Sequence, residues 1–152
     1  MPASPPHSAQ DVTPLAPTKP RLGRLRFAQF TFTRTPSGMG TAEVVLELDR
    51  AEFAGKASGQ SSTMGDVRIS AEAALKALHA FGAGDYKFEL LGMKHLRAFD
   101  TNLLIVSVLV QQADRTVRVV GCALAETDTQ RAAALAVLNA TNRILGDRLE
   151  IP

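Results

Sequence analysis

The chain has 152 residues, of which 45% are hydrophobic and 21% are charged. This length suits one domain with a substantial core, and 17 basic residues against 15 acidic ones do not favour a nucleic-acid-binding protein. The sequence has neither a run of about 20 apolar residues that could span a membrane nor a signal-peptide core, so we expect a cytoplasmic protein with no membrane partner. The single cysteine, Cys122, excludes an intrachain disulfide, and we expect it to be buried and inert within an apolar strand.

Residues 1–20 contain six of the eight prolines. Because proline fixes φ and cannot donate a backbone hydrogen bond, this segment is predicted to be a disordered tail. Residues 21–152 are predicted to form a single α+β domain. Basic residues gather where the two parts meet, at Lys19, Arg21, Arg24 and Arg26. A solvated approach to the first strand is the favoured interpretation of this cluster, and contact with a phosphate backbone is the alternative.

The first strands come directly after this cluster. Residues 24–34 predict a strand with a phase slip near Ala28. Residues 41–49 alternate apolar and acidic side chains, which is typical of a half-buried strand. Residues 51–59 complete a hairpin, and small residues recur on one of its faces, at Gly55, Ala57 and Gly59. A face with so little side-chain volume predicts close packing against another element.

A loop is expected over residues 60–68 and a helix over 69–82. Ser70 is the candidate N-cap of this helix, and Gly82 the candidate residue that ends it. His79 lies beside the apolar stripe of the helix without a partner at motif spacing. We therefore expect His79 to be a structural histidine rather than a ligand or a base.

The second half of the chain repeats this order. Strands are predicted over 86–96, 101–112 and 115–125, and the second of these is apolar throughout, as a central strand would be. A helix is predicted from Asp128 to about Leu145, closed by Gly146.

Similar residues recur at matching places in the two halves. Gly55-Lys56-Ala57 corresponds to Gly121-Cys122-Ala123, and the Ala-Ala-Leu of residues 73–75 corresponds to that of 133–135. The chain is therefore predicted to be a βββα–βββα duplication over about 22–84 and 85–146. Each antiparallel sheet would be covered by one helix, and the two halves would pack together to bury the helices.

The sequence contains no phosphate-binding loop, nucleophile–base set or metal-ligand spacing that would indicate an enzyme. His95 and Asp100 flank a short segment, which is interpreted as a solvated loop. We expect no catalytic residues, no metal and no cofactor. A cleft that joined His79, Asp66 and Asp128 would favour a small enzyme instead.

The second helix is unusually rich in alanine, at Ala132, Ala133, Ala134, Ala136 and Ala140. Such a helix can pack closely on a sheet. At its N-terminus Thr127 and Asp128 are candidates for capping, and Thr127 with Gln130 has the capping-box spacing. The leading N–H groups of the helix are also suited to a ligand carboxylate.

At this helix the sequence resembles the C-terminal regulatory, dimer-forming domain of 2-isopropylmalate synthase and its relatives such as citramalate synthase. The resemblance rests on Gly121, Asp128, 132–134, Ala136 and 139–142, with Ala133 where the family has serine. It covers about residues 22–146 and reaches motif level in roughly the last 25. The family domain is also a βββα duplication, and its catalytic barrel has no counterpart here.

The resemblance implies a non-catalytic, regulatory-type domain that homodimerises and binds a small metabolite such as a branched-chain amino acid. Residues 67–71 stand where the family has Gly-Pro-Val-Asp-Ala, and only the final alanine is kept. The candidate ligand-binding residues are Gly59, Arg68, Ser70, Gly121, Thr127 and Asp128. The alternative function is a nucleic-acid-associated protein that uses the basic segment Lys19–Arg26.

Overall fold

The computed structural model describes residues 25–82, 84–145 and 149–150. The first half of the chain comprises β1 (Leu25–Arg34), β2 (Met39–Leu48), β3 (Ala51–Gln60) and α1 (Thr63–Gly82). The second half comprises β4 (Tyr86–Ala98), β5 (Thr101–Gln112), β6 (Arg115–Leu124) and α2 (Thr129–Thr141). The predicted α+β duplication of βββα units is therefore confirmed. A two-residue strand, β7 (Leu149–Glu150), which the sequence did not predict, pairs in parallel with β1.

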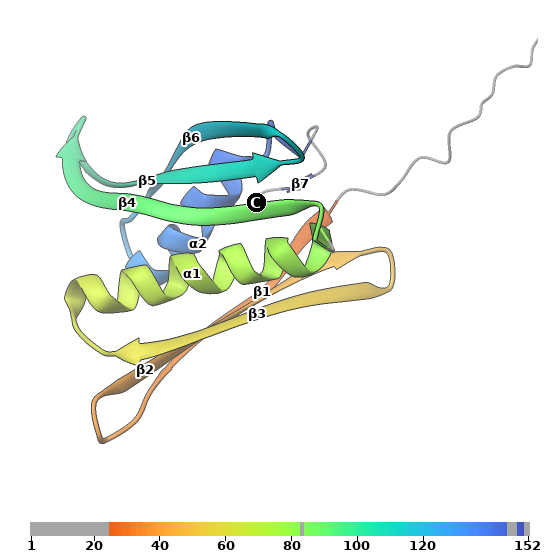
Figure 1. The fold of residues 1–152 in the computed structure, drawn as a ribbon. Helices are drawn as coiled ribbons and strands as arrows, with labels where there is room; N and C mark the ends of the chain where they lie inside the picture. The colour runs from red at the N-terminus through yellow and green to blue at the C-terminus, as the bar shows by residue number, and fades with distance from the viewer. Residues whose placement is uncertain (1–24, 83, 146–148, 151–152) are drawn as a thin grey trace, which may run out of the picture.

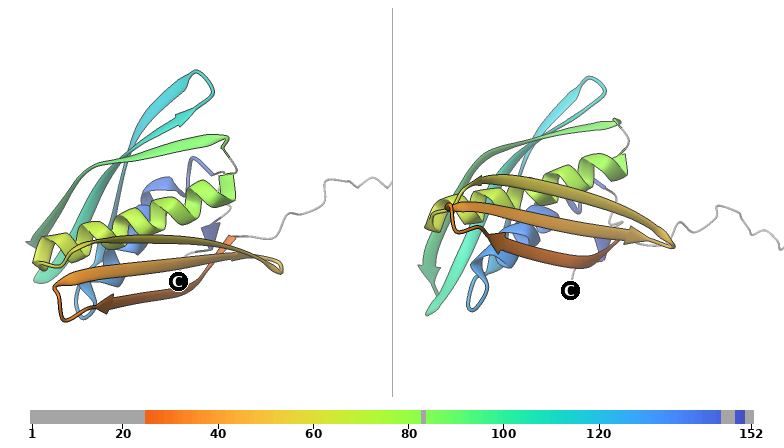
Figure 2. Two further views of the ribbon diagram at one scale, coloured as in Figure 1. Left: turned by 60° about the horizontal axis from the view of Figure 1, so that its bottom comes forward. Right: turned by 90° about the horizontal axis from the view of Figure 1, so that it is seen from below.

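The two sheets enclose the two helices (Figure 1). Sheet A has the strand order β3-β2-β1-β7 and sheet B the order β4-β5-β6. Helix α1 packs on β2 and β3, α2 packs on β5 and β6, and the helices also contact each other. Figure 2 shows this layering from two further directions. The core lies between the inner faces of the sheets and the helices, and no helix of the described residues is long and apolar enough to cross a membrane.

The strands show the alternation that their sequences predict. Ala42, Val44 and Leu46 of β2 are buried, as are the equivalent inward positions of β5. In β1 the register with β2 shifts between Phe27 and Gln29, which confirms the phase slip at Ala28. A matching shift occurs in β4 between Leu90 and Gly92. The same β-bulge therefore occurs in both halves of the duplication.

Two glycines bring a strand close to a helix in each half. A Cβ atom on Gly55 would lie 2.1 Å from the carbonyl oxygen of Ala73, and one on Gly121 would lie 2.3 Å from that of Ala136. Only glycine leaves room for these contacts, so the predicted close packing is confirmed. The contacts also correct the helix correspondence, because Ala73 is equivalent to Ala136 and not to Ala133.

Helix α1 begins earlier than predicted. It starts at Thr63, so Ser70 is not its N-cap, and most of the expected loop 60–68 is helical. Ser70 is buried inside the helix, where its hydroxyl donates to the Asp66 carbonyl oxygen at 2.8 Å. At the other end Gly82 is the last helical residue, and the positive φ of +93° occurs at Gly84 instead. The glycine and serine content of the first turn concealed a helix that tertiary contacts stabilise.

Helix α2 begins as predicted and ends sooner. Asp128 is its N-cap, because its side chain accepts a hydrogen bond from the Arg131 N–H at 2.9 Å. Thr127 precedes the cap and does not provide it. The helix ends at Thr141, whose hydroxyl donates to the Val137 carbonyl oxygen at 2.9 Å, and residues 142–145 form turns. Hydroxyls bonded to the preceding turn and asparagines both weaken helix propagation.

Two further predictions are wrong. Cys122 is exposed on the outer face of sheet B and not buried. Periodicity placed it in a strand correctly but could not tell which face other elements cover. The loop interpretation of residues 95–100 holds only for Phe99 and Asp100, which form the tight β4–β5 turn, where Asp100 has a φ of 60°. His95 lies in β4, in agreement with the strand predicted over 86–96, and β4 continues to Ala98. The proposed tail 1–20, most of the basic cluster and Gly146 lie outside the described residues.

Candidate functional site

The N-terminal turns of both helices meet at one hollow, which we call the junction hollow. Its volume is about 360 Å³. It is lined by Arg34 at the end of β1, residues 61–64, Asp66 and Val67 around the start of α1, His95 of β4, and Thr129 and Gln130 at the start of α2. Both halves of the duplication therefore contribute to the same site.

The start of α1 is held against the end of β3. The Ser62 hydroxyl accepts a hydrogen bond from the Gly65 N–H at 2.9 Å, which is the contact of an N-cap. A Cβ atom on Gly65 would lie 2.6 Å from the Ser62 hydroxyl oxygen and 2.8 Å from the Gln60 carbonyl oxygen. Glycine thus lets the helix begin directly after the strand. The first N–H groups of an α-helix have no acceptor within the helix. In α1 they include those of Thr63 and Met64, and both of these residues line the junction hollow.

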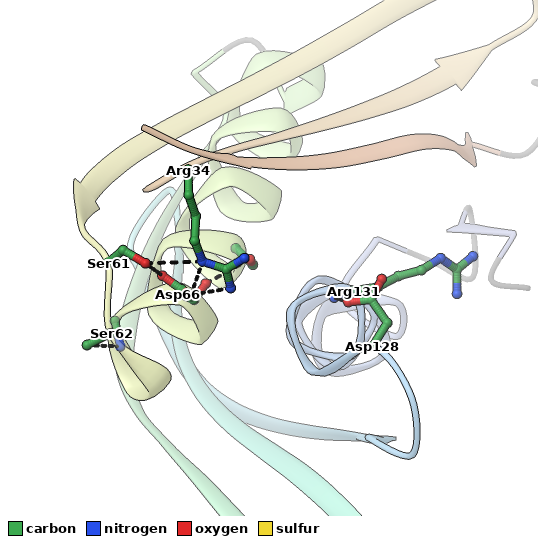
Figure 3. A network of polar contacts seen from close by, with 8 residues as sticks. Arg34, Ser61, Ser62, Asp66, Asp128 and Arg131 are labelled. Carbon is green, nitrogen blue, oxygen red and sulfur yellow. Dashed lines mark hydrogen bonds and ion pairs between the residues drawn. The ribbon is translucent and has the colours of Figure 1, made fainter. Parts of the chain in front are cut away.

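A buried carboxylate organises one wall of the hollow (Figure 3). Asp66 is only 3% exposed. Its Oδ2 accepts hydrogen bonds from Arg34 Nη2 at 2.6 Å and Arg34 Nε at 3.1 Å. Its Oδ1 accepts one from the Ser61 hydroxyl at 2.7 Å. These contacts join the last residue of β1 to the first turn of α1.

The pKa of Asp66 reflects this environment. Burial raises the pKa, but the hydrogen bonds from Ser61 and Arg34, the positive charge of Arg34 and the Ser62 backbone outweigh it, so the pKa falls below its ordinary value of 3.8. Gly40 of β2 leaves space for the Phe32 ring and for the carboxylate, because a Cβ there would lie 2.8 Å from Phe32 Cζ and 3.3 Å from Asp66 Oδ1. Asp66 is therefore an ionised group in a site shaped to hold it.

Arg34 remains accessible despite this ion pair. Its side chain is 55% exposed, and its guanidinium carbon lies 5.0 Å from the centre of the Phe32 ring. With the Gln130 amide oriented to satisfy both of its neighbours, the amide oxygen accepts from Arg34 Nη2 at 3.2 Å and the nitrogen donates to Asp128 Oδ1 at 3.2 Å. Gln130 thus links Arg34, in the first half of the duplication, to Asp128, the N-cap of α2 in the second half.

The six predicted ligand-binding residues do not lie in the junction hollow. Thr127 and Asp128 line a second hollow of about 310 Å³ beside Arg131 and Leu135. Ser70 is buried within α1, and Arg68 is paired with Glu72 at 3.5 Å on its exposed surface. Gly59 faces the Ile69 side chain, and Gly121 lies under α2. The structure brings together only Thr127 and Asp128 of this set.

Sequence reasoning missed Arg34 and Ser61 and named Asp66 only with His79 and Asp128, whereas Arg34, Ser61 and Asp66 form the best-connected polar cluster of the described residues. The available signal was Ser61-Ser62-Thr63 followed by Gly65 and Asp66, a hydroxyl-rich segment with an acidic residue suited to a first helical turn. Nothing local pointed to Arg34, which lies 32 residues before its partner.

His95 lies in the junction hollow with Asp66, and the other titratable groups named above are dispersed. Asp66, Asp128 and His79 line three separate hollows, and a His79 ring nitrogen lies 3.2 Å from the Tyr86 carbonyl oxygen. Among the described residues no three His, Cys, Asp or Glu side chains come close enough together to hold a metal ion. Of the basic segment Lys19–Arg26, the structure describes Leu25 and Arg26, and Arg26 is paired with Glu47.

Comparison with protein-family models and with curated proteins finds no match for this chain. The geometry of the junction hollow is therefore the main indication of function.

Proposed function

We propose that this chain is a non-catalytic, regulatory-type domain that homodimerises and binds a small carboxylate metabolite, such as a branched-chain amino acid, in the junction hollow. One observation carries the metabolite part of the proposal. The first turns of α1 and α2, which come from different halves, line the same hollow together with Arg34.

The electrostatics of the hollow suit an anionic group. Helix N-termini carry partial positive charge and leading N–H groups, which makes them binding sites for carboxylates. Here two such termini contribute Thr63, Met64, Thr129 and Gln130. The half-exposed guanidinium of Arg34 adds a full positive charge and a planar set of donors. A carboxylate between the helices would therefore receive hydrogen bonds from both halves.

The remaining walls suit the other groups of an aliphatic amino acid. Asp66 and the Ser61 and Ser62 hydroxyls are acceptors for an ammonium group, and Met64 and Val67 offer apolar contact. A volume of about 360 Å³ is near the lower end for small-molecule pockets, which favours a small metabolite. The resemblance to the regulatory domain of 2-isopropylmalate synthase, which is also a βββα duplication, supports the choice of a branched-chain amino acid.

Thermal unfolding in the presence of leucine, isoleucine, other amino acids and 2-oxo acids tests the metabolite part. A ligand at 100 times its Kd that binds only the folded chain adds about 2.7 kcal/mol to the free energy of unfolding. We expect one of the branched-chain compounds to raise the melting temperature.

Two variants locate the binding site. Arg34→Gln removes from the junction hollow the guanidinium assigned to the ligand carboxylate and should abolish the stabilisation by leucine or isoleucine. Thr127→Ala alters only the second hollow and should leave it intact. If Thr127→Ala abolishes the stabilisation and the junction-hollow variant does not, the ligand binds in the second hollow. If no compound of the panel raises the melting temperature, the metabolite part of the proposal is refuted.

A further inference from the structure

The outer face of sheet B is apolar and uncovered. The inward residues of β5 are buried by the helices, whereas the outward residues are only partly covered by their neighbours in the sheet. On β6 the outward Val120 and Leu124 are 63% and 56% exposed. In Figures 1 and 2 no described element lies over this face. The apolar face, as we call it, comprises Leu96, Leu103, Ile105, Leu109, Val120 and Leu124.

The duplication shows that the fold does not require this apolar character. When the halves are aligned on Gly55 and Gly121, the outward residues Ala54, Lys56 and Ser58 of β3 correspond to Val120, Cys122 and Leu124 of β6. Likewise Thr41, Glu43 and Glu47 of β2 correspond to Leu103, Ile105 and Leu109 of β5. The same backbone is thus more polar in one half and more apolar in the other, and two outward pairs, Val45 with Ser107 and Thr31 with Lys94, run in the opposite sense. Contiguous exposed apolar surface of this kind marks an interface.

Exposed charges of opposite sign lie in one row of this face, and Lys94 of β4, which pairs with Ile105, adds a further positive charge on the β4 edge. Leu109 of β5 pairs with Glu89 of β4 on one side and with Arg118 of β6 on the other, and both charged residues are exposed. Toward the other end of the sheet, Leu103 pairs with Leu96 and Leu124, which makes an entirely leucine row. The face therefore has one end with opposite charges on opposite edges and an apolar end, with Lys94 on the β4 edge between them.

This pattern is complementary to itself. A two-fold axis parallel to β5 and in front of the face exchanges the positions of β4 and β6 but keeps each row at its own level. Glu89 then faces Arg118 of a second copy, Arg118 faces its Glu89, and the leucine rows stack on each other. An axis perpendicular to the strands would instead place the leucine row on the charged row. The facing Glu89 and Arg118 pairs and the stacked leucine rows together favour a second copy related by an axis parallel to β5, which places Lys94 opposite Cys122 of that copy.

We infer that sheet B is the homodimer interface, with two copies packed face to face about a two-fold axis parallel to β5. This inference rests on the homodimerisation in the proposed function and adds its surface and geometry. Facing sheets pack about 10 Å apart with strands within about 30° of each other, which long Glu and Arg side chains can span.

The interface is small. With strands about 4.8 Å apart and a rise of about 3.3 Å per residue, the face measures roughly 15 by 30 Å. Each copy would bury several hundred Å², which is less than the roughly 800 Å² per partner of a standard interface. We therefore expect a dimer that dissociates measurably on dilution.

Sedimentation across a micromolar concentration range tests the surface. Val120→Glu places a charge on the β6 side of the apolar face, midway along the strand, and should raise the dimer dissociation constant at least about tenfold. The duplication offers a matched control, because Ala54→Glu makes the same change at the equivalent exposed position of sheet A. The control should change the constant by less than about threefold.

Charge reversal tests the axis. E89R and R118E should each weaken the dimer, because like charges would then face each other twice. An equimolar mixture of the two altered chains should restore association, since both facing pairs become opposite in sign. Attraction within one chain cannot produce this rescue.

The outcomes separate the two ideas. If V120E, E89R and R118E all leave the dimer unchanged, sheet B is not the interface. The inference is then overturned, and the chain dimerises through another surface. Disruption by V120E without rescue in the mixture overturns the proposed axis. A chain that is monomeric at every concentration overturns the inference together with homodimerisation, whereas stabilisation by leucine or isoleucine is measured independently of both.

Discussion

The two halves of the molecule share their inner faces and differ in their outer ones. In each half a glycine of the third strand contacts the backbone of its helix, at Gly55 in one and Gly121 in the other. The outer face of sheet A is dominated by threonine, glutamate and lysine, whereas that of sheet B carries leucine, isoleucine and valine. Residues that touch the helices are therefore kept similar by packing, and residues that face outward are free to acquire separate roles.

The two halves also differ at the N-terminal ends of α1 and α2. When the helices are matched at Ala73 and Ala136, Asp66 of α1 falls at the position of Thr129, the first residue of α2. Helix α1 thus has about one additional turn, and that turn brings the Asp66 carboxylate to Arg34. The junction hollow is asymmetric because only the first half contributes a buried charge to it.

The largest expected effect on stability concerns the close strand–helix contacts that the two halves share. Gly55→Ala and Gly121→Ala should each lower the free energy of unfolding by about 3 kcal/mol, since the new Cβ would overlap helix backbone that cannot move freely. Gly92→Ala is the control, because a Cβ there meets nothing within 4 Å. Chemical denaturation measures all three. Small losses at both positions would show that the close contacts do not constrain the packing, and clearly unequal losses would show that the two contacts are not equivalent.

The next effect tests the charge that only the first half possesses. Asp66→Asn should cost about 2 kcal/mol at neutral pH, because it weakens the hydrogen bonds from Arg34 and Ser61. The pKa of Asp66 is lowered by folding, so the stabilisation is complete well above the ordinary value of 3.8 and is lost as the pH falls through the folded value. Urea unfolding at neutral and strongly acidic pH should show the difference between the two proteins disappear in acid. A difference that persists unchanged in acid would contradict the ionised role of Asp66.

A smaller effect compares the two N-caps. Asp128→Ala and Ser62→Ala should each cost about 1 kcal/mol, because each removes the side-chain acceptor of a first-turn N–H. Thr127→Ala, next to the cap in sequence, should change stability by less than about 0.5 kcal/mol. Thermal unfolding can rank the three variants. A loss at Thr127 as large as that at Asp128 would reassign the cap.

The smallest effect on stability concerns Cys122, whose equivalent in sheet A is Lys56. Cys122→Ser should change stability by less than about 0.5 kcal/mol, because the side chain is exposed. Mass spectrometry should show that the folded protein reacts with a maleimide without prior unfolding, and more slowly at concentrations where it dimerises. Reactivity seen only in denaturant would contradict the exposure of the thiol.

Much of the fold could be predicted from the sequence, and little of the site. The strands, the bulge at Ala28, the close contacts of Gly55 and Gly121 and the cap at Asp128 all follow from short-range patterns. The start of α1 did not, because Ser62, Gly65 and Asp66 resemble a loop until the end of β3 and Arg34 are placed beside them. The predicted ligand set followed a resemblance in sequence, whereas the junction hollow depends on where two helix N-termini meet.

The sequence by itself determined the duplicated βββα plan, since period-two alternation and small residues at contact positions are local properties of the chain. Only the tertiary structure decided which side of sheet B is left uncovered and that Cys122 lies on it. It also decided that Arg34 meets Asp66 across 32 residues. An apolar run specifies that a strand forms and can be buried, but whether each of its faces is covered depends on elements distant in the sequence.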